Sequence, residues 1–335
     1  MHYRTLGKTG LRISEVGIGG IPIQRADVQD ACALMTAAAE LGINFLDSAR
    51  AYSVSEEYLG QAIAPMREQF IIATKSGART REAMERDIAL SLRNFRTDYI
   101  ELYQLHNPTA EAFAQITAPG GALEALFAAR DDGKIGHIGI TLHSLELFEK
   151  VLELDWVETI MFPYNIVETQ AEHLLQRCTG KNIGFICMKP MAGGALDDGN
   201  LAMRFIAQNG HISVVIPGVS GAEELRQDVL AYANKAPLTA TEQEKIAAIR
   251  AELGTNFCRR CNYCAPCTAG ISIYSVFLFD GYLTRYHLDD WARLRYDALE
   301  HKASECVQCG VCETRCPYGL PIRQMMKDAA ARFGK

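Results

Sequence analysis

Eight cysteines near the C-terminal end of the chain have the spacing of metal-cluster ligands. The chain has 11 cysteines, and these eight form C-x₂-C-x₂-C-x₂-C in residues 258–267 and C-x₂-C-x₂-C-x₃-C-P in residues 306–317. Three cysteines at this spacing surround one face of a 4Fe–4S cubane, and the cysteine before proline usually ligates the other cluster in two-cluster ferredoxins. The predicted ligand sets are Cys258, Cys261, Cys264 and Cys316 for one cluster, and Cys306, Cys309, Cys312 and Cys267 for the other.

The first motif departs from the usual pattern. It has two residues before its last cysteine, and Thr268 stands where proline is common. The alternative to iron–sulfur clusters is a pair of structural zinc sites, because C-x₂-C pairs also bind zinc. Zinc sites normally use two such pairs rather than triplets, so the spacing favours clusters. Disulfides are disfavoured because the N-terminus has no apolar export signal.

Four polar residues in the first third of the chain stand at or near the ends of predicted strands. They are Asp47, Tyr52, Lys75 and His106. If these strands share one parallel barrel, the four side chains converge on one pocket, where a phenol can donate a proton. The Lys75 ammonium would lower the Tyr52 pKa, Asp47 would make that buried ammonium tolerable, and His106 would orient a carbonyl oxygen or relay a proton.

Eight apolar runs, each followed by a helical pattern, must position these residues. Continuous apolar strands alternating with helices predict an α/β fold, a closed (β/α)₈ TIM barrel. A hairpin over residues 3–14 precedes the barrel and is expected to plug its bottom. We predict the barrel over residues 1–254 and a small α-helical ferredoxin-like domain over 255–335, with residues 272–301 helical. The predicted strands are 15–20, 44–48, 70–75, 100–106, 137–143, 159–165, 184–190 and 214–219.

The strand-end segments resemble the catalytic motifs of the aldo-keto reductase family. The resemblance covers about residues 3–230. It implies that Tyr52 is the general acid, that Lys75 and Asp47 tune it, that His106 places the substrate, and that a nicotinamide supplies hydride. The whole chain is similar to a prokaryotic subgroup with a C-terminal dicluster domain. The matching segments are YRTLGKTGLRISEVGIG (3–19), GINFLDSARAY (42–52), IIATK (71–75), ELYQLH (101–106), GKIGHIGIT (133–141), PYN (163–165) and VVIPG (214–218).

The cofactor residues follow the family pattern less well. A Ser-Asn pair and a Gln usually hold the carboxamide, and this chain has Thr141, Leu142 and Met161 there, so only Thr141 can still hydrogen-bond. This departure leaves open that nicotinamide binding is weak or lost.

The residues expected to contact the adenosine end of the nicotinamide cofactor also depart from the family pattern. NADPH-dependent members carry Lys, Arg and Asn after the eighth strand, whereas this chain has Ser220, Glu224 and Asp228. A carboxylate repels a 2′-phosphate but accepts a hydrogen bond from a ribose 2′-hydroxyl, so we expect NAD(H) rather than NADP(H). The predicted cofactor contacts are Thr141, Pro217, Gly218, Ser220, Glu224 and Asp228.

Composition and charge indicate which partners and which location to expect. The net charge is −6 with 22% charged residues and no long run of one sign, which argues against nucleic acid or an anionic membrane as partner. No apolar stretch approaches the roughly 20 residues that span a bilayer, so we expect a cytoplasmic protein.

These observations predict an oxidoreductase that acts on a small carbonyl or alcohol substrate. The predicted clusters are also compatible with a redox partner protein. Sugars, keto acids and quinone-like compounds all stay open as substrates. The main alternative is an electron-transfer protein whose barrel is a docking scaffold, and the clusters could also be purely structural.

Overall fold

The computed structural model describes residues 1–219, 221–254, 257–259, 262–284 and 289–334. The chain divides into two compact units: Met1–Met191 with Asp198–Gln243, and Ala192–Asp197 with Glu244–Lys335. Each unit has a hydrophobic core of its own. Among the described helices, none has the length and apolar character needed to cross a membrane.

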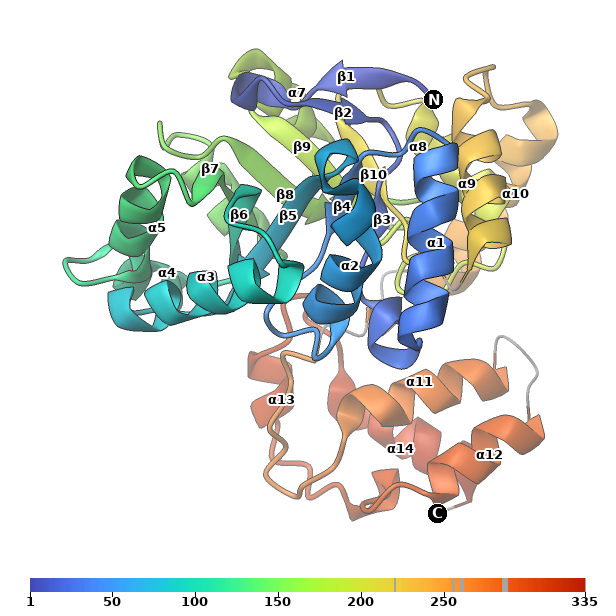
Figure 1. Cartoon of the computed structure of the whole chain (residues 1–335). Helices are drawn as coiled ribbons and strands as arrows, with labels where there is room; N and C mark the ends of the chain where they lie inside the picture. Colours follow the sequence, from blue (N-terminus) through green and yellow to red (C-terminus); the bar gives the residue numbers. More distant parts are fainter. Residues whose placement is uncertain (220, 255–256, 260–261, 285–288, 335) are drawn as a thin grey trace. The chain divides into compact units, whose positions relative to one another are not determined.

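The first unit is built around one sheet of parallel strands. Within the described ranges the sheet has eight strands, ordered β3 to β10 as in the chain, and a parallel bridge between Val16 and Val215 joins its two ends. This arrangement confirms the predicted (β/α)₈ barrel (Figure 1). The strands are β3 (Ile18–Gly19), β4 (Phe45–Asp47), β5 (Ile71–Ser76), β6 (Ile100–His106), β7 (Ile135–Thr141), β8 (Thr159–Pro163), β9 (Gly184–Met188) and β10 (Val214–Ile216).

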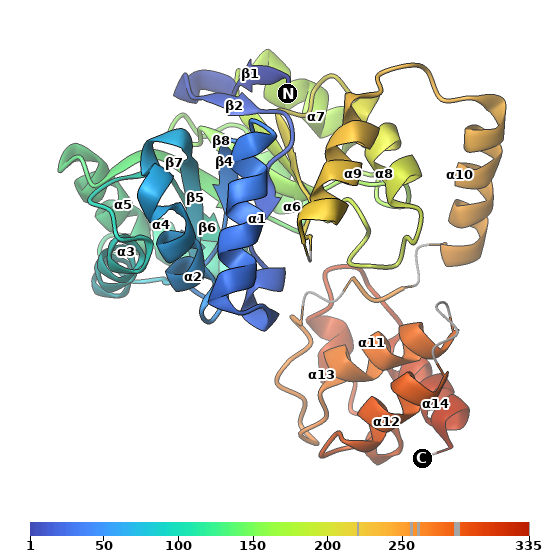
Figure 2. The same cartoon turned by 45° about the vertical axis from the view of Figure 1, so that its right-hand side comes forward.

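Helices surround this barrel and cover the outward faces of its strands. Apolar residues occupy both faces of the strands, as expected when helices cover one face and the barrel interior the other. Both views show α1 beside α9 (Figures 1 and 2). The helices of this unit are α1 (Val28–Glu40), α2 (Ser55–Ile63), α3 (Arg81–Phe95), α4 (Ala110–Thr117), α5 (Ala122–Asp131), α6 (Leu145–Val151), α7 (Glu172–Gly180), α8 (Gly199–Ala207) and α9 (Ala222–Ala233).

An N-terminal hairpin closes the end of the barrel where the strands begin. Strands β1 (Tyr3–Thr5) and β2 (Arg12–Ser14) pair antiparallel. Leu6 and Ile13, both fully buried, belong to the cluster of side chains that fills the barrel interior. A Cβ on Gly7 would lie 2.2 Å from the backbone nitrogen of Gly184, the first residue of β9, so glycine is needed for this close approach. The predicted plug is confirmed, and substrate access is left to the carboxyl ends of the strands.

The second unit is helical and packs around aromatic and aliphatic side chains. The rings of Tyr296 and Phe333 stack with centroids 3.9 Å apart, and Val276 and Met326 are buried in the same core. The predicted helical stretch between the cysteine motifs is confirmed by α11 and α12. The remaining helices are α10 (Ala240–Leu253), α11 (Ile273–Thr284), α12 (Asp289–Asp297), α13 (Val311–Thr314) and α14 (Ile322–Phe333).

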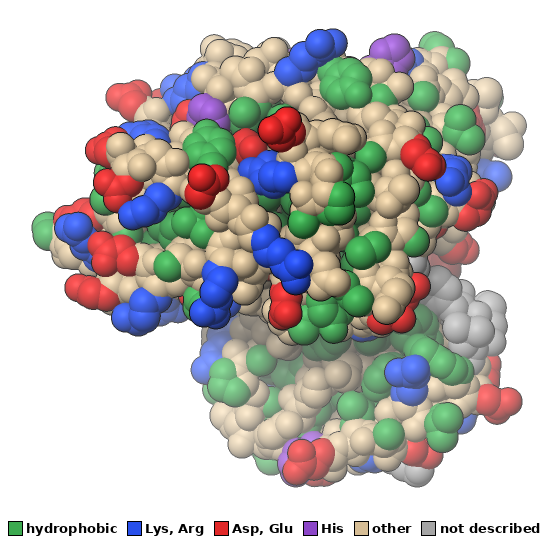
Figure 3. All heavy atoms as spheres, in the orientation of Figure 1, with side chains coloured by type: hydrophobic (Ala, Val, Ile, Leu, Met, Phe, Trp, Pro, Cys, Tyr) green, Lys and Arg blue, Asp and Glu red, His purple; other side chains and the backbone are tan. Residues whose placement is uncertain are grey.

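The charged side chains are interspersed on the viewed surface of the molecule. Figure 3 shows Lys and Arg among Asp and Glu over the barrel, with neither sign gathered into one large field.

The division into compact units falls at Gln243, inside α10. A domain boundary at residue 254 stays a prediction.

Candidate active site and cluster site

A buried ion pair lies at the carboxyl ends of two neighbouring strands. Asp47 is the last residue of β4 and Lys75 is near the end of β5, and their side chains are 3% and 1% exposed. The Lys75 Nζ donates to an Asp47 Oδ1 and to the Ser48 carbonyl oxygen (2.7 Å). Burial alone would lower the Lys75 pKa, but the charge of Asp47 outweighs it and raises the pKa above its ordinary value. The ammonium is therefore charged.

Tyr52 and His106 complete this group of side chains. The Lys75 Nζ lies 4.9 Å from the centroid of the Tyr52 ring, and the His106 ring meets the Tyr52 ring edge-on with centroids 5.8 Å apart. The structure therefore brings all four predicted residues together. They come from β4 and the loop after it, from β5 and from β6, because neighbouring parallel strands end at the same rim.

The protonation state of Tyr52 is set mainly by burial. Burial raises the Tyr52 pKa, the Lys75 ammonium lowers it, and the Asp47 carboxylate raises it again, so that the net shift is upward. The predicted influence of Lys75 has the expected sign, but it does not leave the pKa below its ordinary value. The phenol consequently keeps its proton near neutral pH, as a proton donor must.

His106 is neutral at physiological pH. Burial, and secondarily the Lys75 ammonium, lower its pKa to about 3. A neutral imidazole can donate or accept a hydrogen bond, whereas a relay through the imidazolium would require protonation in an unfavourable environment. Of the two roles expected for His106, this neutral state favours orientation of a substrate oxygen over proton relay.

The lowered His106 pKa predicts a pH dependence of stability. The unfolded chain binds a proton at His106 near the ordinary pKa of 6.5, and the folded chain only near 3. The stabilising contribution of this group is therefore complete above pH 6.5. It is lost as pH falls toward 3, by up to about 1.4 kcal/mol per pH unit. His106→Asn should reduce the loss in unfolding free energy between pH 7.5 and 5.5 in urea titrations. The exposed His2, changed to Asn, is the control; equal slopes for both variants would contradict the prediction.

Gln104 is a site residue that the sequence did not single out. It lies on β6 with a fully buried side chain, and its Nε2 donates to Asp47 Oδ2 at 3.1 Å. Its Oε1 is buried without a hydrogen-bond partner among the described residues. The amide thus holds the second oxygen of Asp47 while Lys75 holds the first. A polar residue inside the apolar strand sequence was the available signal.

Glu56 was also missed, and it fixes the loop that carries Tyr52. The Glu56 carboxylate, 1% exposed, pairs with Arg50 and accepts hydrogen bonds from Thr74 Oγ1 (2.7 Å) and Ser91 Oγ (2.8 Å). Arg50 and Glu56 flank Tyr52 in sequence. Their partly buried pairing therefore restrains both ends of the segment that places the phenol.

The predicted carboxamide contact is turned toward a neighbouring strand. Thr141 ends β7 with 1% exposure, and its hydroxyl donates to the Met161 sulfur at 3.5 Å. Leu142 is fully buried and apolar. A thioether is a weak acceptor, so this hydroxyl can exchange it for a ligand oxygen at small cost. These residues offer one hydrogen-bonding side chain where the family usually has three.

The predicted adenosine contacts lie after β10. Pro217 and Gly218 follow the strand directly, and the Pro217 carbonyl accepts from the Gly19 backbone at 2.8 Å. Glu224 is exposed on the first turn of α9, and Asp228 is buried one turn later. Burial, together with the charge of Glu224, raises the Asp228 pKa to about 7. Ser220 lies outside the described residues.

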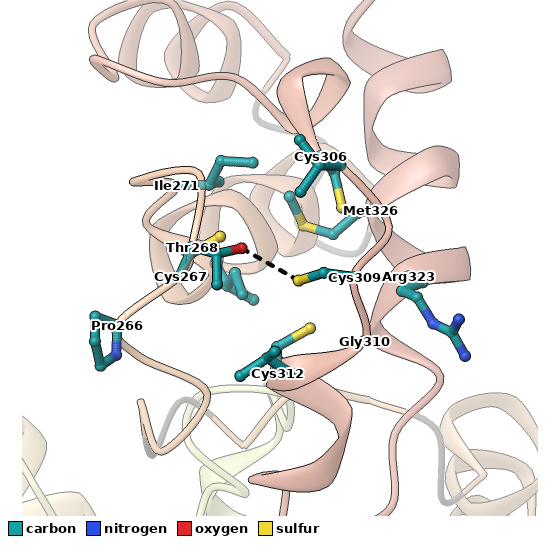
Figure 4. A pocket seen from close by; sticks show the side chains of 13 residues that line it. Pro266, Cys267, Thr268, Ile271, Cys306, Cys309, Gly310, Cys312, Arg323 and Met326 are labelled. Atoms are coloured by element: carbon teal, nitrogen blue, oxygen red, sulfur yellow. Dashed lines mark hydrogen bonds between the residues drawn. The ribbon is translucent and has the colours of Figure 1, made fainter.

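Four cysteines of the second unit surround one cavity (Figure 4). Apolar side chains, including Ile271, Ile273 and Met326, complete the wall. In the ranges that the structure describes, no three His, Cys, Asp or Glu side chains come close enough to hold a single metal ion. Four thiols spread around an apolar-walled space fit the ligand chemistry of a cubane. The cysteines are Cys267, Cys306, Cys309 and Cys312.

This grouping is the crossed set predicted from the sequence. Cys267 comes from the first motif, and the other three come from the second. Of the remaining set, Cys264 is buried, and Cys258 and Cys316 are partly buried against the core of the same unit. Cys261 lies outside the described residues.

A closed parallel barrel with a buried lysine–aspartate pair and a phenol at its rim defines a (β/α)₈-barrel enzyme, here joined to a cysteine-rich helical unit. Residues 15–202 match the model of the aldo/keto reductase family, and residues 257–321 match that of a 4Fe-4S dicluster domain. The chain belongs to the aldo/keto reductase family, and it is an oxidoreductase with a C-terminal 4Fe-4S dicluster domain, a domain type that implies two clusters.

The relatives described next resemble between 57% and 74% of this chain. An uncharacterized oxidoreductase of Bacillus subtilis, YqkF, is 29% identical over 245 residues, covering 68% of this chain and 78% of that protein. The NADH-specific methylglyoxal reductase of Escherichia coli is 26% identical, covering 57% of this chain and 68% of that protein. The holo form of an aldo-keto reductase from Bacillus halodurans has a TM-score of 0.65 and 25% identity, covering 74% of this chain and 96% of that one.

Proposed function

We propose that the protein transfers hydride between NAD(H) and a small carbonyl or alcohol compound, with Tyr52 exchanging the proton. The observation that carries this proposal is the charged Lys75–Asp47 pair buried beside the protonated Tyr52, with His106 against the same ring. The family implies a nicotinamide and small carbonyl substrates. A bound nicotinamide would supply or accept the hydride.

Each side chain then has one task. In reduction, the Tyr52 hydroxyl donates its proton to the substrate oxygen as negative charge develops there, and the Lys75 ammonium stabilises the phenolate left behind. Asp47 keeps Lys75 charged, with its second oxygen held by Gln104. His106, neutral, orients the substrate oxygen toward Tyr52. In alcohol oxidation the same groups act in reverse.

The proposal is tested by anaerobic assay of NADH oxidation with a panel of small aldehydes and ketones. Binding of NADH and NADPH is measured separately by calorimetry. Turnover of at least one carbonyl compound supports the proposal. A protein that binds neither nucleotide would instead have the second candidate function, electron transfer with the barrel as scaffold. The observation that favours this second function is the single hydrogen-bonding side chain, Thr141, at the carboxamide position, turned toward Met161.

A preference for NADH over NADPH is expected from the charge near the adenosine end. The exposed Glu224 carboxylate on the first turn of α9 would repel a 2′-phosphate, and the E. coli relative is NADH-specific by name. Glu224→Arg should move the NADPH/NADH ratio of kcat/KM toward NADPH by about tenfold or more, since a close charge reversal is worth more than 1 kcal/mol. Glu223→Arg, on the same exposed turn, is the control. Tighter NADPH binding by the unaltered protein would refute the preference.

A further inference from the structure

The residue that breaks the first cysteine motif contacts a cysteine of the second. Thr268 follows Cys267, and its hydroxyl oxygen lies 3.2 Å from the sulfur of Cys309, as the dashed line in Figure 4 marks. The two residues are 41 positions apart in sequence. A proline at residue 268 would have no hydroxyl to make this contact. The departure from the motif therefore brings a polar group to the cluster cavity.

A second polar side chain approaches another sulfur at the same cavity. The Gln308 Nε2 lies 3.3 Å from the Cys306 sulfur. Gln308 has a left-handed backbone conformation (φ 57°) and sits between Cys306 and Cys309 in the chain. Two of the four sulfurs that line the cavity consequently have a hydrogen-bonding side chain beside them.

The direction of these hydrogen bonds follows from the chemistry of the sulfur. A cysteine bound to iron is a thiolate without a hydrogen, so the hydroxyl and the amide must be the donors. Donation to a ligand sulfur stabilises negative charge on the cluster. Because reduction adds negative charge, such bonds favour the reduced state and raise the reduction potential.

The cationic side chain that lines this cavity, Arg323, is itself paired with a carboxylate. The Arg323 guanidinium packs beside Gly310, but its Nε donates to the Glu313 carboxylate at 2.8 Å. Figure 4 shows the end of Arg323 directed away from the cavity. By contrast, Thr268 and Gln308 are directed at the sulfurs themselves.

We propose that Thr268 and Gln308 raise the reduction potential of the cluster held by Cys267, Cys306, Cys309 and Cys312. This inference rests on that ligand set. The two side chains make this cluster a better electron acceptor than its cysteines alone would. Of the four cysteines, Cys309 is exposed to solvent and Cys312 is buried.

The test is a redox titration of the anaerobically purified full-length protein, followed by electron paramagnetic resonance. Thr268→Val removes the hydroxyl at nearly constant shape, and Thr268→Ser retains it. Thr268→Val should shift the equilibrium of one cluster toward its oxidised form by about tenfold, about 59 mV for one electron, and leave the other cluster unchanged. Thr268→Ser should stay near the unaltered protein. Gln308→Leu should shift the same cluster in the same direction.

Measuring the iron and sulfide content distinguishes a failure of this inference from a failure of the ligand assignment on which it rests. A Thr268→Val protein with all its iron and sulfide but with unchanged potentials would overturn the role of Thr268, and so would equal shifts in both clusters. Cys267→Ala tests the ligand set independently: if it loses no iron, the assignment of Cys267 fails whatever the potentials show.

Discussion

Replacing Tyr52 by phenylalanine is expected to lower turnover of a carbonyl substrate by about 10²–10⁴-fold, the usual cost of losing a general acid. Phenylalanine keeps the ring that His106 contacts edge-on and removes only the ionisable oxygen. The Lys75–Asp47 pair stays intact, so folding and cluster content should not change. Steady-state kinetics of the anaerobically purified variant, with iron analysis and thermal unfolding, provide the measurement.

The control is Tyr99→Phe, which removes a phenol near the start of β6, at the opposite end of that strand from His106. Its turnover should stay within about twofold of the unaltered protein, as is usual for surface changes away from a site. Retention of most activity by Tyr52→Phe would show that the phenol does not donate the proton. Lys75→Met is a less clear test, because it leaves the buried Asp47 unpaired and is expected to destabilise the protein by about 3–5 kcal/mol.

The second large effect is expected at the cluster cavity. The unaltered protein should contain about eight irons and eight acid-labile sulfides per chain, as two cubanes require. Cys267→Ala should lower the iron content to about four, and the cluster that disappears should be the one ligated by Cys306, Cys309 and Cys312. Iron and sulfide analysis with visible and paramagnetic resonance spectra of anaerobic samples would measure this.

Cys178→Ala is the matched control, because Cys178 is a buried thiol of the barrel unit whose pKa burial raises to about 12. Its iron content should not change. Stoichiometric zinc in place of iron would contradict the cluster assignment itself. Loss of the cluster that contains Cys258 and Cys264, with the other retained, would show that Cys267 ligates within its own motif rather than across motifs.

Local patterns in the sequence determined the architecture and most of the candidate site. The eight apolar runs predicted the eight barrel strands, because strands buried on both faces are continuously apolar. Asp47, Lys75 and His106 could be placed at one rim from the chain alone, since parallel strands end together. The cysteine spacing likewise predicted that Cys306, Cys309 and Cys312 share one site, because the turns of such a triplet are local; Cys267 was added from the crossed pattern of two-cluster ferredoxins.

Long-range packing decided what these groups can do. The upward pKa shift of Tyr52 and the neutral state of His106 come mainly from burial, which depends on neighbours distant in sequence. Glu56 and Gln104 read as ordinary helix and strand residues until the fold placed them against Arg50 and Asp47. In the sequence, Thr268 is only a departure from the cysteine motif. The tertiary structure shows that its hydroxyl lies beside the Cys309 sulfur. Periodicity and spacing record which face or turn a residue occupies, whereas desolvation and partner choice arise only when separate segments pack together.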